Sequence, residues 1–205
     1  MWERTLWRIG FRRVAGVDEA GRGALAGPVV ASAVVLPPDF PSDGIDDSKR
    51  LSAAQRDAAY DRIMAGALAV GVGTADSGEI DRVNILQATK QAMAQAIGAL
   101  QPSPDFLLTD AVEFPSVLPL WALIKGDHRA LAIAAASIIA KVTRDRLMVR
   151  YHAQYPGYNF LLHKGYGTPE HLTMLRTFGR CPIHRQSFRP VCDSPLSGAR
   201  GAHAE

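Results

Sequence analysis

Apolar runs that alternate with amphipathic stretches predict a chain of alternating strands and helices. Small and β-branched residues fill three early runs, at 14–17, 28–36 and 68–74, and such runs are typical of buried strands. Two shorter apolar runs, at 105–110 and 118–124, predict two further strands. Because the first three strands follow one another closely, we expect them to pair antiparallel at one edge of a mixed sheet.

Helix start signals and helical spacing lie between these runs. Ser52 and Gln55 have the spacing of a capping box, ahead of a surface helix that ends near Gly66 and packs on the sheet. A second helix is expected at 86–100, where apolar residues recur at a helical period until Pro102 stops the pattern. The predicted fold class is therefore α/β, with a mixed five-stranded sheet flanked by helices.

The alanine-rich run at 131–155 predicts the longest helix, because it holds no glycine and no proline. Thr168 before Pro169 is a good helix start and predicts a last helix through Phe178. The core face of the longest helix is expected to consist of Leu131, Ala135, Ile138, Val142 and Val149.

Composition indicates one globular domain. A chain of 205 residues, 47% of them hydrophobic, can bury a substantial core, and we expect a single domain at 1–192, including a C-terminal helical part, and a flexible tail at 193–205. No apolar run approaches the roughly 20 residues that span a bilayer, and the first residues lack a signal-peptide core. A cytoplasmic location without a membrane partner is therefore expected. Cys181 and Cys192 are expected to be reduced thiols, and the net charge of +3 permits a polyanionic partner without requiring one.

Carboxylates stand at or just after the ends of three predicted strands. Asp18 and Glu19 end the first, Asp110 ends the fourth, and Asp127 follows the fifth. Neighbouring acids repel one another unless a cation lies between them. Together, these four acids suit two hard divalent cations about 4 Å apart, an arrangement used for phosphoryl transfer. Taken singly, each aspartate fits a cap or turn equally well.

Gly21, Arg22 and Gly23 follow the first two acids directly. Glycines let the backbone approach a ligand closely, and an arginine between them can hold a phosphate. The acids and this turn therefore predict metal ligands beside a phosphate or sugar contact.

A collinear series of short motifs resembles type 2 ribonuclease H, ribonuclease HII, from about residue 9 to about residue 191. The resemblance implies a ribonuclease H-like fold and endonucleolytic cleavage of the RNA strand in RNA–DNA hybrids. It also implies nicking 5′ of single ribonucleotides in duplex DNA and two Mg²⁺ or Mn²⁺ ions per active site. The motifs are DEAGRG at 18–23, GPVV at 27–30, DSK at 47–49, TDA at 109–111, KGD at 125–127, AASI at 135–138, AKVTRD at 140–145 and HKGYGT at 163–168.

The same resemblance implies residue roles. The catalytic, metal-binding acids are Asp18, Glu19, Asp110 and Asp127, and cleavage leaves a 3′-hydroxyl and a 5′-phosphate. Gly21, Arg22 and Gly23 lie at the RNA-to-DNA junction, where the 2′-hydroxyl marks the ribose, and Tyr166 stacks on the following sugar.

Four cations are candidates for contacts with backbone phosphates. Lys49 and Lys164 are preferred because each adjoins a turn, and Lys141 and Arg185 are further candidates. Asp145, four residues after Lys141, is interpreted as a salt-bridged structural residue. No catalytic role is assigned to His163, His171 or His184.

Some features depart from the family or leave alternatives open. Ala24 stands where proline is frequent, and Ala111 where glycine often follows the third acid. The sequence has no aromatic C-terminal motif for a sliding clamp, and nothing in it demands more than a monomer. Two alternatives are another ribonuclease H-like nuclease of the resolvase or integrase type, and a noncatalytic hybrid-binding module.

Overall fold

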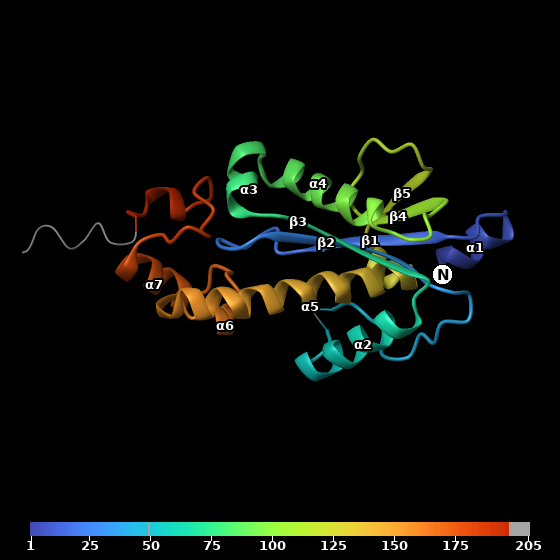
Figure 1. The fold of residues 1–205 in the computed structure, drawn as a ribbon, viewed down its shortest axis with the longest axis horizontal. Helices are drawn as coiled ribbons and strands as arrows, with labels where there is room; N and C mark the ends of the chain where they lie inside the picture. The colour runs from blue at the N-terminus through green and yellow to red at the C-terminus, as the bar shows by residue number, and fades with distance from the viewer. Residues whose placement is uncertain (49, 197–205) are drawn as a thin grey trace, which may run out of the picture.

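In residues 1–48 and 50–196, which the computed structural model describes, five strands form one mixed sheet (Figure 1). The sheet order is β3-β2-β1-β4-β5. β1, β2 and β3 pair antiparallel, whereas β4 pairs parallel with both β1 and β5, so the predicted sheet is confirmed. The strands are β1 (Val14–Ala20), β2 (Val29–Val35), β3 (Ala69–Ala75), β4 (Phe106–Asp110) and β5 (Leu120–Leu123).

Helices cover both faces of this sheet. Figure 1 shows α3 and α4 on one face and α5 on the other, with α1 at one end of the molecule and α6 and α7 at the opposite end. The helices are α1 (Trp2–Arg8), α2 (Ala53–Gly66), α3 (Ser77–Val83), α4 (Ile85–Gly98), α5 (Leu131–Gln154), α6 (Phe160–His163) and α7 (Pro169–Phe178), and the single 3-10 turns are η1 (Gly126–His128), η2 (Pro156–Tyr158) and η3 (Val191–Asp193).

Two main cores lie on the two faces, because successive strand side chains point in opposite directions. On β2, Ala33 and Val35 pack in the α4 core, whereas Val34 packs in the α5 core. The backbone of α5 lies directly on β1: a Cβ at Gly16 would be 2.0 Å from the Ala132 carbonyl carbon. This close contact brings the first turns of α5 next to the strand end that holds Asp18.

The predicted capping box of α2 is confirmed, but its packing differs from the prediction. The Gln55 amide donates to Ser52 Oγ at 3.3 Å, and the Ser52 amide donates to Gln55 Oε1 at 2.8 Å. α2 contributes Ala59 and Ile63 to the α5 core and lies mainly against α5, which separates it from most of the sheet (Figure 1).

The long helix α5 is confirmed, but its predicted core face is wrong at one position. Ala135, Ile138 and Val142 are buried, whereas Val149 is 43% exposed. Beyond Val142 the buried side chains of α5 are Arg144 and Met148, because this end of the helix faces the C-terminal segments instead of the sheet.

The predicted last helix is also confirmed, since Thr168 Oγ1 accepts from the His171 amide at the start of α7. Part of the predicted tail packs on the domain: the Arg180 amide donates to Pro195 O at 2.7 Å, and residues 197–205 lie outside the described residues. Within the described part of the chain, no helix is long and apolar enough to cross a membrane.

Candidate active site

Asp18 and Asp110 lie side by side at the ends of two parallel strands. Val17 pairs with Thr109, so the next residue of each strand is an aspartate. Asp18 points to the same face of the sheet as Gly16, two residues earlier, and is therefore directed toward α5. Its side chain is only 7% exposed and accepts a hydrogen bond from the Ser137 hydroxyl of that helix.

The electrostatics of Asp18 oppose its ionisation. Burial raises the pKa of Asp18 well above its ordinary value, and the charges of Glu19 and Asp110 raise it further. Hydrogen bonds from the Glu19 amide, at 2.7 Å, and from Ser137 lower the pKa of Asp18 by less. The three carboxylates are thus close enough to repel one another, and a bound cation relieves that repulsion.

Asp110 connects this cluster to the turn that carries Asp127. The Gly126 amide donates to Asp110 Oδ1 at 2.8 Å, and Asp127 is the next residue, within η1. Ala111, which follows Asp110, has a left-handed backbone with φ +53°. Glycine adopts that conformation without strain, whereas alanine adopts it at a cost.

Asp127 also belongs to a second group of potential ligands. One carboxylate oxygen each from Asp47 and Asp127 and one ring nitrogen of His128 lie within 4.8 Å of one another. The structure therefore brings Asp18, Glu19 and Asp110 together and places Asp127 beside them through Gly126. Asp47 and His128 were not predicted as neighbours of this acid, although Asp47 lies in the DSK motif and His128 follows Asp127 directly.

The turn after β1 is built around Gly21. Its φ is +94°, and a Cβ there would lie 2.0 Å from Arg144 Nε, so both the backbone and the available space require glycine. The Ala24 amide donates to Gly21 O at 3.3 Å, a bond that a proline at this position could not make. A Cβ at Gly23, in contrast, would meet no atom within 4 Å.

Glu19, the glycine turn and Tyr166 share one hollow of about 540 Å³. Arg22 reaches back across its edge, with Nη1 3.1 Å from Glu19 Oε1. The predicted site residues Glu19, Gly21, Arg22, Gly23 and Tyr166 are therefore brought together. The hollow is lined by Glu19, Ala20, Gly21, Arg22, Gly23, Ser48, Ser137, Lys141 and Tyr166.

Tyr166 is held by its backbone and by two cations. The Tyr166 amide donates to His163 O at 2.9 Å, and the Tyr166 carbonyl lies 2.9 Å from His171 Nδ1. Its half-buried ring lies 5.2 Å from Arg144 Cζ and 5.8 Å from Lys141 Nζ. The ring therefore has a fixed position at the edge of the hollow.

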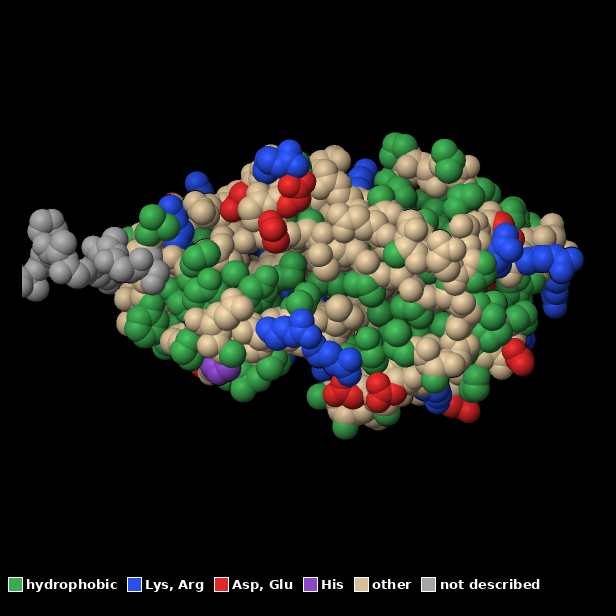
Figure 2. Space-filling model, in the orientation of Figure 1, with side chains coloured by type: hydrophobic (Ala, Val, Ile, Leu, Met, Phe, Trp, Pro, Cys, Tyr) green, Lys and Arg blue, Asp and Glu red, His purple; other side chains and the backbone are tan. Residues whose placement is uncertain are grey.

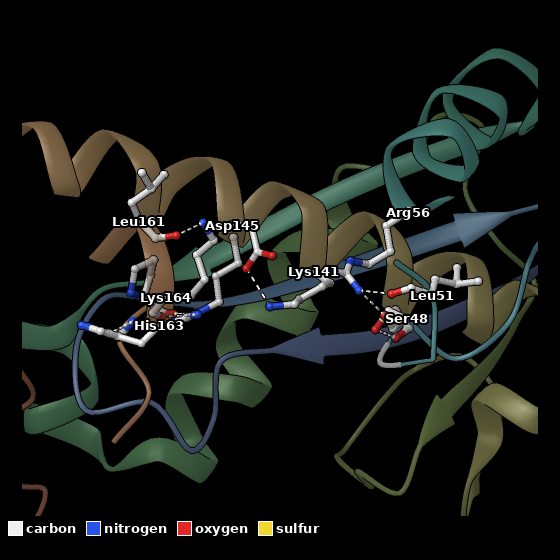
Figure 3. Close-up of polar contacts among 12 residues, drawn as sticks. Ser48, Leu51, Arg56, Lys141, Asp145, Leu161, His163 and Lys164 are labelled. Atoms are coloured by element: carbon white, nitrogen blue, oxygen red, sulfur yellow. Dashed lines mark hydrogen bonds and ion pairs between the residues drawn. The ribbon is translucent and has the colours of Figure 1, made fainter. Parts of the chain in front are cut away.

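The predicted lysines differ in their surroundings (Figure 3). Lys141 Nζ lies 2.7 Å from Asp145 Oδ1, which confirms the predicted salt bridge of Asp145. Lys164 Nζ donates to Leu161 O at 2.6 Å, and burial lowers the pKa of Lys164. Lys164 lines a neighbouring hollow of about 360 Å³ with Arg56 and Arg146, and Lys49 lies outside the described residues.

Arg56 fixes the backbone at Ser48 and at Leu51. It donates to Ser48 O at 2.8 Å and also to Leu51 O (Figure 3). Ser48 Oγ lies 2.8 Å from Ser137 Oγ, and Ser137 in turn donates to Asp18. Ser48 of the DSK motif is therefore anchored next to the acids.

Arg185 was expected to be a possible phosphate contact, and this is wrong because its side chain is 0% exposed. Its guanidinium donates to the carbonyl oxygens of Gly21, Arg22 and Gly27. Burial and the nearby charge of Arg144 lower the pKa of Arg185 to about 9, so it remains a cation at neutral pH.

The histidines form a buried cluster away from the acids. His171 Nε2 lies 3.0 Å from His184 Nε2, and the rings of His163 and His171 stack with centroids 4.3 Å apart. Burial lowers the pKa of His171 to about 4 and of His184 to about 3, so both are neutral at physiological pH. His171 also contacts the Tyr166 carbonyl and so supports the Tyr166 loop.

The face of the molecule drawn in Figure 2 carries charged side chains of both signs. Figure 2 shows Lys and Arg side chains in separate groups on this face, one of them beside acidic side chains between α5 and α2, and no continuous basic patch. This mixed pattern agrees with the small net charge of +3.

The chain is similar to known ribonucleases in sequence and in structure. The family model described as Ribonuclease HII matches residues 15–191. Ribonuclease HII of Geobacillus thermodenitrificans is 56% identical over 93% of this chain and 73% of its own length. Ribonuclease HII of Geobacter metallireducens is 55% identical over 92% of both chains.

Solved structures of ribonucleases have a similar fold. Ribonuclease H2 of Pyrococcus horikoshii superposes with a TM-score of 0.74 at 27% identity, covering 88% of this chain and 96% of that one. RNase HII of Archaeoglobus fulgidus, solved in complex with PCNA, gives a TM-score of 0.73 at 27% identity over 86% and 95% of the two chains. On the strength of the family match, the sequence identities and the fold, the chain belongs to the ribonuclease HII family and is a metal-dependent nuclease with ribonuclease H activity.

Proposed function

We propose that this enzyme cleaves the RNA strand of RNA–DNA hybrids and also nicks duplex DNA 5′ of a single embedded ribonucleotide. The products are a 3′-hydroxyl and a 5′-phosphate. The observation that carries the proposal is the shared hollow: the Gly21–Arg22–Gly23 turn and Tyr166 line the same space as Glu19, beside Asp18 and Asp110. A group that recognises ribose and a group that supports hydrolysis are thus in reach of one nucleotide.

The acids fit divalent cations by their chemistry. Asp18, Glu19, Asp110 and Asp127 would hold two Mg²⁺ or Mn²⁺ ions, since hard cations prefer carboxylate oxygens. When bound, such ions supply an activated water and stabilise the leaving oxygen. The fit rests on Asp18, whose buried charge is opposed by Glu19 and Asp110 and is favoured by a nearby cation.

The open side of the glycine turn suits ribose recognition. The 2′-hydroxyl distinguishes ribose from deoxyribose and can bond to backbone groups only where the backbone is accessible. No atom lies within 4 Å of the Cβ position of Gly23, so a sugar can approach the peptide groups of the turn there. Arg22, with a side chain 44% exposed, can hold an adjacent phosphate.

Tyr166 and the lysines complete the proposed substrate contacts. The Tyr166 ring stacks on the sugar after the ribonucleotide, where an additional hydroxyl would collide with the ring. Lys164 and Lys49 contact backbone phosphates, which contributes affinity without reading sequence.

The test is cleavage of end-labelled duplex DNA that carries one ribonucleotide, with Mg²⁺ or Mn²⁺. We expect one metal-dependent nick 5′ of the ribonucleotide, lost in Asp110→Asn and absent from an all-DNA duplex. Equal cutting of the all-DNA duplex indicates a nuclease without ribose recognition, of the resolvase type. Cutting of long hybrids without any nick at the single ribonucleotide limits the function to hybrids.

A further inference from the structure

Arg185 is a buried cation whose guanidinium is directed at backbone carbonyls. Nη1 donates to Arg22 O at 2.8 Å, and Nη2 donates to Gly21 O at 2.7 Å and to Gly27 O at 3.0 Å. Nε donates to Gly27 O at 3.1 Å. Neither carbonyl of the turn comes from a residue near Arg185 in the chain, since Gly21 lies 164 residues away.

We propose that Arg185 is a positioning residue for ribose recognition: it fixes the Gly21–Arg22–Gly23 turn in the orientation that contacts the substrate. This inference rests on the proposed function of that turn. Arg185 has no exposed surface and touches no substrate, so it acts through the turn alone.

Peptide geometry explains how Arg185, by binding carbonyl groups of the turn, also orients the N–H groups of the turn. In a trans peptide the C=O and N–H groups point in opposite directions. Because Arg185 binds the carbonyls of Gly21 and Arg22, the N–H groups of Arg22 and Gly23 point away from it. The turn itself lines the hollow, so these N–H groups can donate to an acceptor oxygen there, either of a hydroxyl or of a phosphate. The positive charge behind the two peptides also polarises them in the direction that strengthens their N–H donors.

The arginine is itself held firmly. Its amide donates to Leu25 O at 2.9 Å, and its guanidinium lies 5.1 Å from the Phe188 ring. Its neighbour Arg144 binds a different set of carbonyls, those of Ala26, Pro28 and Lys164. Arg144 thus fixes the chain after the turn and the loop of Lys164, whereas Arg185 binds the turn itself.

The required geometry is specific to a guanidinium. A lysine keeps the charge, but a single ammonium cannot reproduce the planar fork that reaches the carbonyls of Gly21, Arg22 and Gly27 together. We therefore expect Arg185→Lys to fold and to cleave a single-ribonucleotide duplex about 10- to 100-fold more slowly, the factor implied by the loss of one or two charge-assisted hydrogen bonds.

A double-mutant cycle with Arg22→Ala distinguishes an effect of Arg185 on the position of the turn from an effect on the stability of the protein. Single-turnover rates are measured for wild type, Arg185→Lys, Arg22→Ala and the double variant, at a temperature where thermal melting shows all four folded. We expect the double variant to lose clearly less than the product of the two single losses, because both changes act on the same turn. Arg189→Lys, an exposed arginine of the same segment, is the matched control and should match wild type.

Different experimental results would contradict the role of Arg185 and the proposed function of the enzyme. If Arg185→Lys melts earlier but cleaves at the wild-type rate, or if the two losses multiply, Arg185 is not a positioning residue for this turn. If Arg22→Ala has no effect, the turn does not contact the substrate and the inference fails with it. If wild type does not nick at the ribonucleotide, the proposed function fails instead.

A second variant covers the case in which Arg185→Lys does not fold. Phe188→Leu retains the arginine but removes the ring against its guanidinium. We expect a loss of a few-fold that is again non-multiplicative with Arg22→Ala. A wild-type rate, or fully multiplicative losses, would argue against the inference.

Discussion

Arg22 and Glu19 form an ion pair at 3.1 Å, which joins the cation of the glycine turn to an acid of the candidate active site. The Glu19 side chain is 10% exposed and that of Arg22 is 44% exposed, so water screens the pair. Such partly exposed pairs contribute about 0–1 kcal/mol. Arg22 can therefore leave Glu19 for a substrate phosphate at little cost.

Arg22→Ala should accordingly weaken substrate binding without destabilising the protein. We expect the free energy of unfolding to change by less than about 1 kcal/mol. The salt dependence of substrate binding should become shallower by about one phosphate contact. The measurement is KM for a single-ribonucleotide duplex at several salt concentrations, with thermal melting alongside. An unchanged salt slope would show that Arg22 does not bind a phosphate.

Substitution by alanine should destabilise the protein at Gly21 but not at Gly23. At Gly21, the φ of +94° and the 2.0 Å approach to Arg144 Nε make alanine strained, and we expect Gly21→Ala to lower the free energy of unfolding by more than about 2 kcal/mol. At Gly23, where no atom lies within 4 Å of the Cβ position, we expect a change within about 0.5 kcal/mol.

Gly23→Ala should lower activity although it leaves stability unchanged. If the open side of the turn receives the ribose, Gly23→Ala should slow cleavage at a single ribonucleotide at least tenfold despite normal melting. The measurement pairs thermal melting with single-turnover rates for both variants. A Gly23→Ala enzyme with wild-type rates would mean that the space beside Gly23 is not used by the substrate.

Asp18→Asn should remove activity and yet stabilise the metal-free protein near neutral pH. The pKa of Asp18 is raised in the folded state by burial and by the charges of Glu19 and Asp110, so the folded state holds this proton more tightly than the unfolded chain does. Stability therefore falls as the pH rises above the ordinary aspartate pKa of about 4. Asparagine cannot ionise and avoids this loss.

The comparison is made by thermal melting with EDTA between pH 4 and pH 8. The gap between Asp18→Asn and wild type should widen in favour of the variant as the pH rises. Added Mg²⁺ should stabilise wild type more than Asp18→Asn, because a cation that binds the folded state opposes the repulsion. A gap that is constant across this pH range contradicts the assigned cause of the pKa shift.

Much of the fold could be predicted because its signals are local. The capping box of Ser52 and Gln55 and the glycine-free run of α5 lie in a few adjacent residues, and both are confirmed. α1, α3 and α6 were not predicted, because helices of seven residues or fewer span at most two turns and show little periodicity. Val149 was assigned to the core because helical periodicity continues beyond the point where α5 leaves the sheet.

In the candidate site, too, some residues could be predicted from local sequence signals and others could not. Asp18 and Asp110 could be identified because each ends an apolar strand, and the parallel pairing of β1 and β4 then brings them together. The role of Arg185 could not be predicted, since its partner carbonyls lie 158 to 164 residues away and belong to the backbone, which leaves no pattern in the side chains. As an isolated cation in the sequence, it resembled a phosphate contact.

The histidine cluster should make stability fall in mild acid. The Cys181 amide donates to His184 Nδ1 at 3.0 Å, which leaves the proton of neutral His184 on Nε2, facing His171 Nε2. His171 then carries its proton on Nδ1 and donates to Tyr166 O. Protonating His171 places its Nε2–H against that of His184 at 3.0 Å, and protonating His184 places its Nδ1–H against the Cys181 amide at 3.0 Å. Both clashes agree with the lowered pKa values.

The sign of the effect follows from the direction of the shift. Burial lowers the pKa of His171 to about 4, below the ordinary value of about 6.5, so the unfolded chain binds the proton first. The stability due to neutral His171 is complete above pH 6.5 and is lost as the pH falls toward 4, by on the order of 3 kcal/mol. Asp18 acts in the opposite direction over part of this range, so each residue is assessed against its own variant.

His171→Asn is the variant that isolates this contribution. The asparagine amide can still donate to Tyr166 O, but it does not titrate and no longer reaches His184. We expect lower stability than wild type at pH 7, by about 1–3 kcal/mol, and a difference that shrinks as the pH falls from 6.5 to 4. Urea unfolding at several pH values measures this difference. If it stays constant over that range, the neutral histidine pair is not what couples the stability of the Tyr166 loop to pH.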